Sequence, residues 1–194
     1  MQVVAVKGSV RENLGKKWAK AARKEGAIPC VLYGGDSVHH FTTTNNEIKS
    51  LIYTGDFKLA ELTIGNTSAK CFVKDIQFHP VSDKVTHIDF LELVPGQTVN
   101  LEVPVRFKGT SPGVKVGGKL VQNLRRIKIK TTPEKMVDQL TLDVSGLELG
   151  SSIRVRDIEQ VEGVEIMNSP GIPVANVEIP RALRSAAAAA AKEA

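Results

Sequence analysis

Short segments rich in valine and isoleucine recur along the whole 194-residue chain, and this pattern constrains the fold most strongly. In 126–131 (RIKIKT) and 141–145 (TLDVS), apolar and polar side chains alternate, as on a strand with one buried and one solvated face. Branched aliphatic side chains also favour strands. Only 5% of the residues are aromatic, so the core must consist mainly of valine, leucine and isoleucine. The sequence therefore predicts a mainly β protein (α+β) with a few short helices.

The expected strands and helices are located from these patterns and from turn and capping residues. Strands are expected at 1–10, 30–35, 40–44, 58–65, 69–78, 85–93, 99–107, 118–124, 126–131, 139–145, 152–158, 164–167 and 173–179. The fourth and fifth of them should form a hairpin through a turn at 66–68. A helix is expected at 18–24, before Gly26 and Pro29. A second is expected within 45–54, with Asn45 or Asn46 as its N-cap and Gly55 after its end.

A domain boundary is expected near residue 93, because Pro95 and Gly96 interrupt the strand pattern there. Charge also changes along the second half of the chain. Residues 106–135 contain nine Lys/Arg and one acid, whereas 136–165 contain two arginines and seven acids. The predicted organisation is a first domain at 1–92, a β-rich second domain at 93–184, and an alanine-rich tail at 185–194 that is expected to fray or to be disordered.

Composition limits the compartment and the class of partner only loosely. The net charge is +5 and the pI about 9.2, a modest indication of a polyanionic partner. Cys30 and Cys71 lack the spacing of a metal site, and we expect reduced, buried thiols. The sequence shows neither a signal peptide nor an apolar segment long enough to span a membrane, so a cytoplasmic protein is expected.

The stretch 76–91 (IQFHPVSDKVTHIDFL) contains two of the four histidines. If two strands are joined here by a turn at 79–84, the resulting hairpin has two different faces. One is an expected core face with Ile76, Phe78, Ile88 and Phe90. The other is an expected polar face with Gln77, His79, His87 and Asp89, and with Asp75, Val85 and Leu91 on the same side. Polar groups would then be displayed together.

The residues alone leave three interpretations of this polar face open. A metal site would use His79, His87 and Asp89, with Gln77 as a poor fourth ligand, but the spacing matches no closed metal motif. His87 and Asp89 could instead form a catalytic dyad, although the sequence contains no nucleophile elbow, paired-carboxylate motif or HExxH. The third interpretation is a solvated strand face whose histidines form local hydrogen bonds.

A basic segment upstream favours a fourth interpretation, which is contact with RNA. Six cations occur within fourteen residues: Arg11, Lys16, Lys17, Lys20, Arg23 and Lys24. Such side chains neutralise phosphates and release counterions. Gly15, in the same segment, would let the backbone approach a partner closely. The chain has one Trp and two Tyr, which argues against base stacking and favours recognition of folded or double-stranded RNA by shape.

Two segments, RENLGKKWAKAARKEGAIPCVLYGG and KDIQFHPVSDKVTHIDFLEL, resemble the signatures of the bacterial large-subunit ribosomal protein family that binds 5S rRNA. VPVRFKGTSPGVKVGGKL and DVSGLELGSSIRVRDI resemble the second domain of its longer, two-domain form, the Ctc (general stress protein) type, so the resemblance covers the whole chain. It implies a six-stranded β-barrel-like first domain that binds 5S rRNA. Positions that match the family's motifs are Arg11, Gly15, Lys16, Arg23, Lys24, Tyr33, Gly34, Gln77, His79, His87 and Asp89.

The resemblance implies a structural, non-enzymatic constituent of the large ribosomal subunit in the cytoplasm, with no cofactor, metal, membrane or small-molecule substrate. Expected partners are 5S rRNA and, as neighbours, 23S rRNA and other ribosomal proteins. Lys17 and Lys20 of the basic segment are added to these positions. The predicted RNA-binding residues are therefore Arg11, Gly15, Lys16, Lys17, Lys20, Arg23, Lys24, Tyr33, Gly34, Gln77, His79, His87 and Asp89. The alternatives are a metal-dependent hydrolase using His79, His87 and Asp89, and a stress-related factor that acts away from the ribosome.

Overall fold

The computed structural model describes residues 1–65 and 67–181, and the alanine-rich tail predicted at 185–194 lies outside them. The chain divides into two compact units. The first comprises Met1–Val99 and Thr132–Met136, and the second comprises Asn100–Thr131 and the chain from Val137 onward. Each unit has its own strands and its own buried residues, so we describe them separately.

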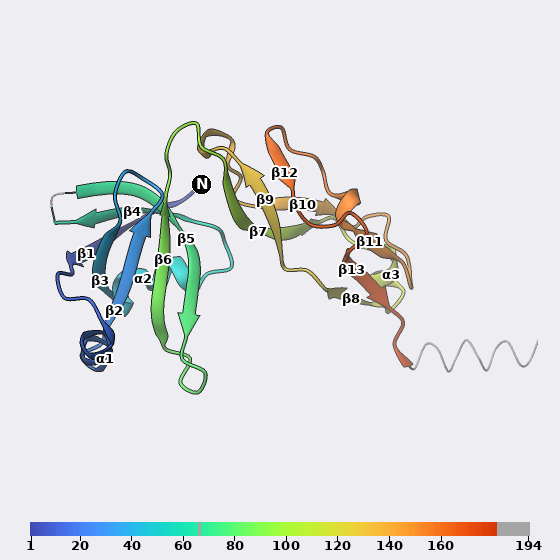
Figure 1. The fold of residues 1–194 in the computed structure, drawn as a ribbon. Helices are drawn as coiled ribbons and strands as arrows, with labels where there is room; N and C mark the ends of the chain where they lie inside the picture. The colour runs from blue at the N-terminus through green and yellow to red at the C-terminus, as the bar shows by residue number, and fades with distance from the viewer. Residues whose placement is uncertain (66, 182–194) are drawn as a thin grey trace, which may run out of the picture. The chain divides into compact units, whose positions relative to one another are not determined.

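Six strands of the first unit form a closed barrel in the order β1-β3-β2-β6-β5-β4 (Figure 1). Their bounds are β1 Val3–Val10, β2 Ala27–Tyr33, β3 His39–Thr44, β4 Leu59–Ile64, β5 Thr67–Phe78 and β6 Val85–Glu92. Two parallel pairs, β1 with β4 and β2 with β6, close the barrel, and the other pairs are antiparallel. The predicted six-stranded barrel is confirmed.

The barrel interior is filled by the inward-facing side chain of every second strand residue, as expected for a small barrel. Val6, Leu32, Phe41, Ile88 and Phe90 are completely buried and belong to one apolar cluster. The rings of Phe41 and Phe90 lie 5.7 Å apart between centroids. Because aliphatic side chains dominate this cluster, the expectation of an aromatic-poor core is met.

Two helices accompany the barrel: α1 (Lys16–Lys24) and α2 (Asn45–Ile52). Gly15 immediately precedes α1 with a φ of 122°, a conformation that side-chain-bearing residues rarely adopt. Ile48 and Leu51 of α2 are buried in the barrel cluster. The N-cap of α2 is Thr44, so the prediction of Asn45 or Asn46 was wrong. Strand β3 runs directly into the helix, which places the transition one residue earlier.

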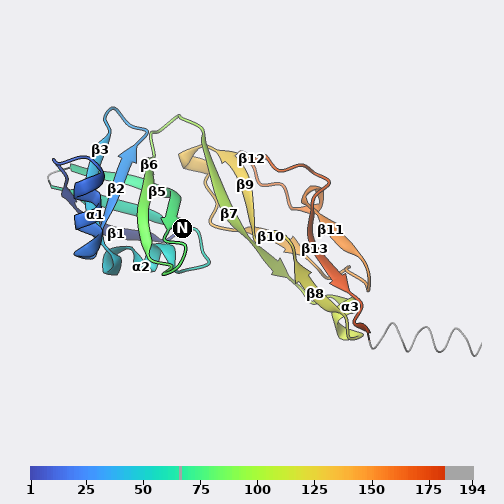
Figure 2. The ribbon, with the colours of Figure 1, turned by 60° about the horizontal axis from the view of Figure 1, so that its bottom comes forward.

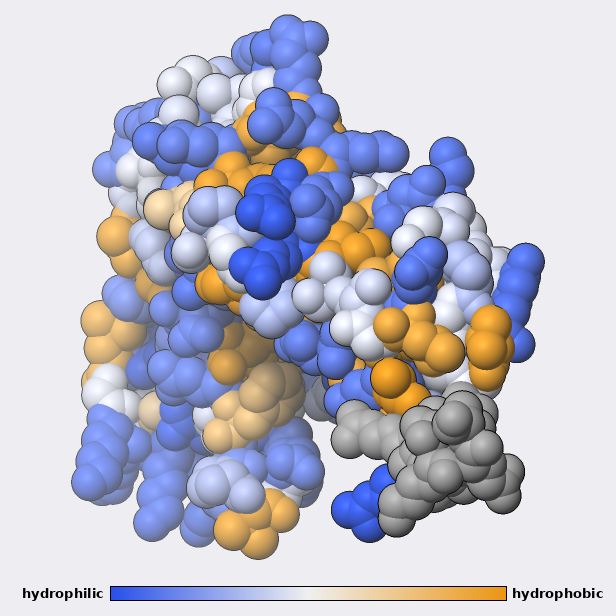
Figure 3. Space-filling view, turned by 90° about the vertical axis from the view of Figure 1, so that its right-hand side faces the viewer, coloured by the Kyte–Doolittle hydropathy of each residue, from blue (hydrophilic) through white to orange (hydrophobic). Residues whose placement is uncertain are grey.

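The second unit contains two small sheets (Figure 2). One has the order β10-β7-β9-β12 and the other the order β11-β13-β8. Their strands are β7 Val99–Lys108, β8 Lys119–Gln122, β9 Arg126–Thr131, β10 Leu140–Asp143, β11 Ser152–Arg154, β12 Val164–Ile166 and β13 Pro173–Glu178, with a short helix α3 at Pro112–Lys115. The second domain is therefore β-rich, as predicted. Figure 3 shows one face of the molecule, on which hydrophilic side chains predominate and apolar groups lie between them.

The strand expected at 152–158 in the second unit is confirmed only in its first half. The chain leaves β11 at Val155 and forms a turn of 3₁₀ helix through Asp157, whereas a strand was expected to continue to residue 158. The carboxylate of Asp157 accepts a hydrogen bond of 2.8 Å from the backbone N–H of Arg154. This local bond competes with strand pairing, which the alternating sequence could not reveal.

Both cysteines are free and completely buried in the barrel. Burial, and to a smaller extent the nearby Glu92 carboxylate, raise the pKa of the Cys71 thiol to about 12. Burial also raises the pKa of Cys30, assisted by the negative charge of Asp89. Both thiols are therefore protonated at neutral pH. In the described part of the chain, no helix has both the length and the apolar character needed to cross a bilayer.

We expect the native protein to resist a thiol-specific disulfide reagent at pH 8, whereas both cysteines react once guanidinium unfolds the chain. A raised pKa means that the folded state holds the proton more tightly than the unfolded state does. The two thiols should therefore stabilise the fold below pH 9 and lose this contribution as pH rises from about 9 toward 12. Labelling kinetics measure the protection of the two thiols, and alkaline denaturation curves measure the loss of stability. Labelling of the folded chain faster than it unfolds would contradict the prediction.

Candidate nucleic-acid interface

The hairpin of β5 and β6 brings three of the predicted site residues together on the outer wall of the barrel. Gln77 lies directly opposite His87, and Asp75 lies opposite Asp89. On its other edge, β6 pairs with β2, where Val31 lies opposite Asp89. Cross-strand partners of this kind have Cβ atoms about 5 Å apart. Gln77, His87 and Asp89 therefore form one polar strip, as the alternation predicted.

Two β-bulges change the rest of the predicted faces. The register shifts at Lys74 in β5 and at Thr86 in β6. Because of the second bulge, Val85 turns inward and is 7% exposed, although it was predicted on the polar face. Phe78, predicted in the core, is the last residue of β5 and is 47% exposed. These two assignments were wrong.

His87 and Asp89 form a close pair within the polar strip. Nδ1 of His87 lies 2.7 Å from Oδ1 of Asp89, and both side chains are partly exposed, at 25% and 29%. The carboxylate accepts a hydrogen bond from Nδ1–H and so holds the imidazole in one orientation. Nε2 of His87 then stays available to a partner outside the protein.

His79 lies in the turn after β5 and has a different role. Its Nδ1 accepts hydrogen bonds of 3.3 Å from the backbone N–H groups of Val81 and Ser82. Its own backbone N–H donates to the carbonyl of Lys84 at 2.8 Å. Because Nδ1 acts as an acceptor, the neutral ring carries its proton on Nε2. His79 thus organises the turn and presents an N–H donor from an exposed side chain.

Helix α1 lies beside β2 (Figure 2), and Thr86 ties it to the polar strip. Nε of Arg23 donates a hydrogen bond of 2.9 Å to the carbonyl of Thr86. The hydroxyl of Thr86 in turn donates to the carbonyl of Gln77 at 3.0 Å. The bulge at Thr86 leaves this residue without an opposite residue in β5, and its carbonyl accepts the bond from the helix. The sequence carries no signal that singles out Thr86.

The lysines of the basic segment remain exposed after α1 has docked. Ala22 is the buried residue of the helix, whereas Lys16, Lys17, Lys20 and Lys24 are exposed. Arg11 lies before the helix with its guanidinium 4.4 Å from the centre of the Trp18 ring, and its Nε donates to the carbonyl of Asn13. Arg11 thus stabilises the loop that leads into the helix.

Tyr33 and Gly34 lie at the end of β2, beside β6. Tyr33 lies opposite Leu91. Burial raises the pKa of Tyr33, and the negative charges of Asp89 and Asp75 raise it further. Gly34 has a φ of 105°, and a Cβ there would lie 2.7 Å from Cδ1 of Leu91. Glycine is therefore required for the close approach of this turn to β6.

We expect Arg23→Lys to loosen α1 although the charge is kept, because lysine lacks the Nε–H that reaches Thr86. A net hydrogen bond is worth about 1 kcal/mol, so amide exchange in the last turn of α1 should accelerate roughly fivefold. Hydrogen exchange measures this, and 5S rRNA affinity should fall with it. Arg156→Lys, at an exposed position of the second unit, is the control. Equal exchange rates in the two variants would show that Arg23 does not hold the helix.

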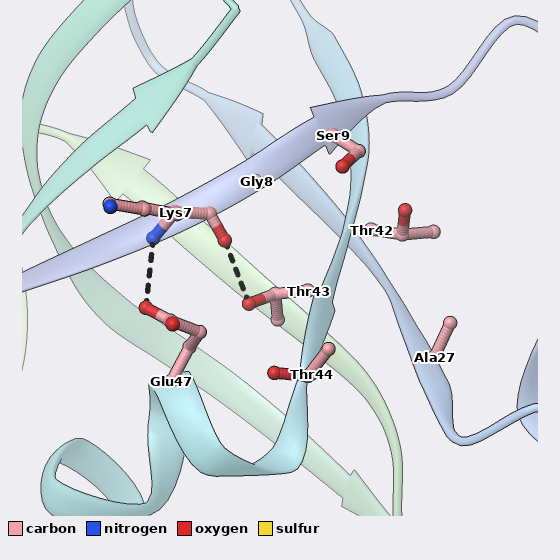
Figure 4. Close-up of a pocket in the computed structure, with 8 residues that line it drawn as sticks. All are labelled: Lys7, Gly8, Ser9, Ala27, Thr42, Thr43, Thr44 and Glu47. Atoms are coloured by element: carbon pink, nitrogen blue, oxygen red, sulfur yellow. Dashed lines mark hydrogen bonds between the residues drawn. The ribbon is translucent and has the colours of Figure 1, made fainter.

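The arrangement offers little to the hydrolase alternative. Within residues 1–65 and 67–181, no three His, Cys, Asp or Glu side chains are grouped closely enough to hold a metal ion. A pocket on the barrel is lined by Lys7, Gly8, Ser9, Ala27, Thr42, Thr43, Thr44 and Glu47 (Figure 4). Its polar groups bind one another: the N–H of Lys7 donates to Glu47, and the hydroxyl of Thr43 donates to the carbonyl of Lys7. It contains neither histidine nor cysteine.

Comparisons with known proteins identify relatives over the full chain. Residues 6–90 match the family described as "Ribosomal L25p family", and residues 98–181 match "Ribosomal protein TL5, C-terminal domain". "Large ribosomal subunit protein bL25" of Cytophaga hutchinsonii is 42% identical over 193 residues and covers 100% of both chains. The protein of the same name from Bacteroides fragilis is 39% identical, and the match covers 99% of this chain and 100% of that protein. The one from Porphyromonas gingivalis is 42% identical, and the match covers 96% of this chain and 98% of that protein.

Proposed function

The chain belongs to the ribosomal L25p family, and on this basis we propose that it binds 5S rRNA through the barrel unit. It is a structural component of the large ribosomal subunit and not an enzyme, and it acts in the bacterial cytoplasm. One observation carries the proposal: Arg23 and Thr86 fasten the basic helix α1 beside the strip of Gln77, His87 and Asp89. We assign the binding to residues 1–92 and an accessory role to residues 93–184.

The proposed mechanism is recognition of a folded RNA by shape. The exposed lysines of α1 neutralise phosphates, which supplies the salt-dependent part of the affinity. Gln77, His87 and Asp89 offer an amide, an imidazole nitrogen and a carboxylate to 2′-hydroxyls and base edges of a shallow RNA minor groove. The N–H donor of His79 and the hydroxyl of Tyr33 extend this polar surface. Gly34, next to Tyr33, has no side chain that would stand between an RNA and the backbone there.

A gel-shift titration of 5S rRNA with the full chain tests the proposal. Unlabelled tRNA serves as competitor, and the titration is repeated at about 0.1 and 0.4 M salt. Binding that survives competition is expected. If tRNA displaces labelled 5S rRNA from the protein as readily as unlabelled 5S rRNA does, α1 is only a basic surface that binds any polyanion. Sedimentation of cell lysate tests the remaining alternative, a stress-related factor that acts away from the ribosome. Such a factor would not sediment with large subunits.

We expect Asp89→Asn to weaken 5S rRNA binding about tenfold. The carboxylate holds Nδ1–H of His87 through a charge-assisted hydrogen bond, and such bonds are worth about 1.5 to 3 kcal/mol. The amide can rotate and leave the imidazole without a fixed orientation. Gel-shift titration measures the change, and Asp75→Asn on the neighbouring strand is the control. Stronger binding of the Asp89 variant would mean that the carboxylate only repels phosphate.

A further inference from the structure

A second basic surface lies in the other unit, on strand β9. This strand alternates strictly: Ile127, Ile129 and Thr131 are buried, whereas Arg126, Lys128 and Lys130 are exposed. Arg125, just before the strand, is exposed as well. β9 lies between β7 and β12 in its sheet, so Arg126, Lys128 and Lys130 are displayed on a sheet face and not on an edge. We call Arg125, Arg126, Lys128 and Lys130 the β9 cation row.

We propose that the β9 cation row binds the phosphate backbone of a second RNA segment, at a site separate from the barrel. Successive exposed residues of a strand lie about 6.6 Å apart on one face. This separation is similar to that between neighbouring phosphates of an RNA strand, so Arg126, Lys128 and Lys130 can meet consecutive phosphates. The protein would then join two RNA segments, one through each unit.

The backbone of β9 is held firmly at the centre of the row. The N–H of Lys128 donates a hydrogen bond of 2.7 Å to Oδ1 of Asn168, and the N–H of Met167 donates to the carbonyl of Lys128 at 2.9 Å. β12 continues this pairing, with Glu165 opposite Lys130. A row of charges on a fixed backbone loses less entropy on binding than a row on a mobile loop does.

Acidic neighbours moderate the charge of the row but do not cancel it. Nζ of Lys128 lies 3.7 Å from Oε1 of Glu102, and the two side chains are 67% and 50% exposed. Glu165 is the second acidic neighbour, opposite Lys130. An exposed pair of this kind contributes at most about 1 kcal/mol, so a phosphate can replace the carboxylate. The four cations still outnumber these two acids.

RNA fits this surface better than a protein partner does. Interfaces between proteins have an apolar or aromatic centre. The large exposed apolar side chains of the described part of the second unit are Val114, Val116, Val161 and Met167, and none of them is aromatic. Met167 directly follows β12 and lies beside Lys128, to whose carbonyl its N–H donates. The row therefore offers four cations beside one exposed methionine and no aromatic anchor, a composition that suits phosphate binding.

The test uses the full chain and a 20-base-pair RNA duplex of arbitrary sequence, first alone and then with the barrel site filled by unlabelled 5S rRNA. The variant changes Arg125, Arg126, Lys128 and Lys130 to Gln. The matched control removes the same charge from the same unit by changing Lys115, Lys119, Arg154 and Arg156 to Gln. All eight positions are exposed. Affinity is measured over a range of salt concentrations.

We expect the β9 variant to bind the duplex about 100-fold more weakly than the control in the presence of 5S rRNA, with a salt dependence that is shallower by about three units. Its affinity for 5S rRNA itself should not change. Equal duplex affinity and equal salt dependence of the two variants would overturn the proposal. Failure of the barrel to bind 5S rRNA would appear instead in the titration of 5S rRNA alone, so the two proposals fail separately.

Discussion

Replacing Lys16, Lys17 and Lys20 together with glutamine is expected to weaken 5S rRNA binding about 100-fold near 0.15 M salt. Each lost phosphate contact lowers the salt dependence of the binding constant by about 0.9 units and, at this salt concentration, the affinity about fivefold. All three lysines are exposed on a helix that is held in place through Arg23. Their removal should therefore take away charge without moving the helix.

Gel-shift titrations at several salt concentrations measure both quantities, and the slope should become shallower by two to three units, or about 0.9 per contact. The control replaces Lys7, Lys49 and Lys70 with glutamine, which removes the same charge from exposed positions on β1, α2 and β5. If the two triple variants lose equal affinity, net charge and not the position of α1 governs binding. An unchanged slope in the first variant would exclude phosphate contacts by these lysines.

Phe90→Ala is expected to lower the free energy of unfolding of the barrel unit by about 4 kcal/mol. The side chain is completely buried, and its ring packs 5.7 Å from that of Phe41. Strand β6 is paired on both edges, with β2 and with β5, so the backbone cannot move inward to fill the cavity. A loss of this size is a large part of the stability of a typical domain.

Urea denaturation followed by far-ultraviolet circular dichroism measures this loss. Phe78→Ala is the matched control, because it removes the same ring from the other strand of the same hairpin. Phe78 is 47% exposed, and its loss should cost less than about 1.5 kcal/mol. Equal destabilisation by the two substitutions would place both rings in the core.

The sequence was sufficient for most strands and for the polar strip. Alternation along 85–93 predicted that Ile88 and Phe90 face the core while His87 and Asp89 face outward, and the structure agrees. The basic helix was also predicted, although it begins at Lys16, two residues earlier than expected. The N-cap of α2, the ends of β11 and the positions of Phe78 and Val85 were not correct.

By itself, the sequence determined the local features of this protein: the period of each strand, the basic character of residues 11–24 and the motifs that indicate its family. These depend on residues close together in the chain, where side-chain spacing decides which face each residue occupies. Only the tertiary structure decided the barrel closure through β1–β4 and β2–β6, the bulge at Thr86 and its contact with Arg23, 63 residues away. The physical reason is that one extra residue in one strand reverses the faces beyond it, and only the partner strand reveals that residue.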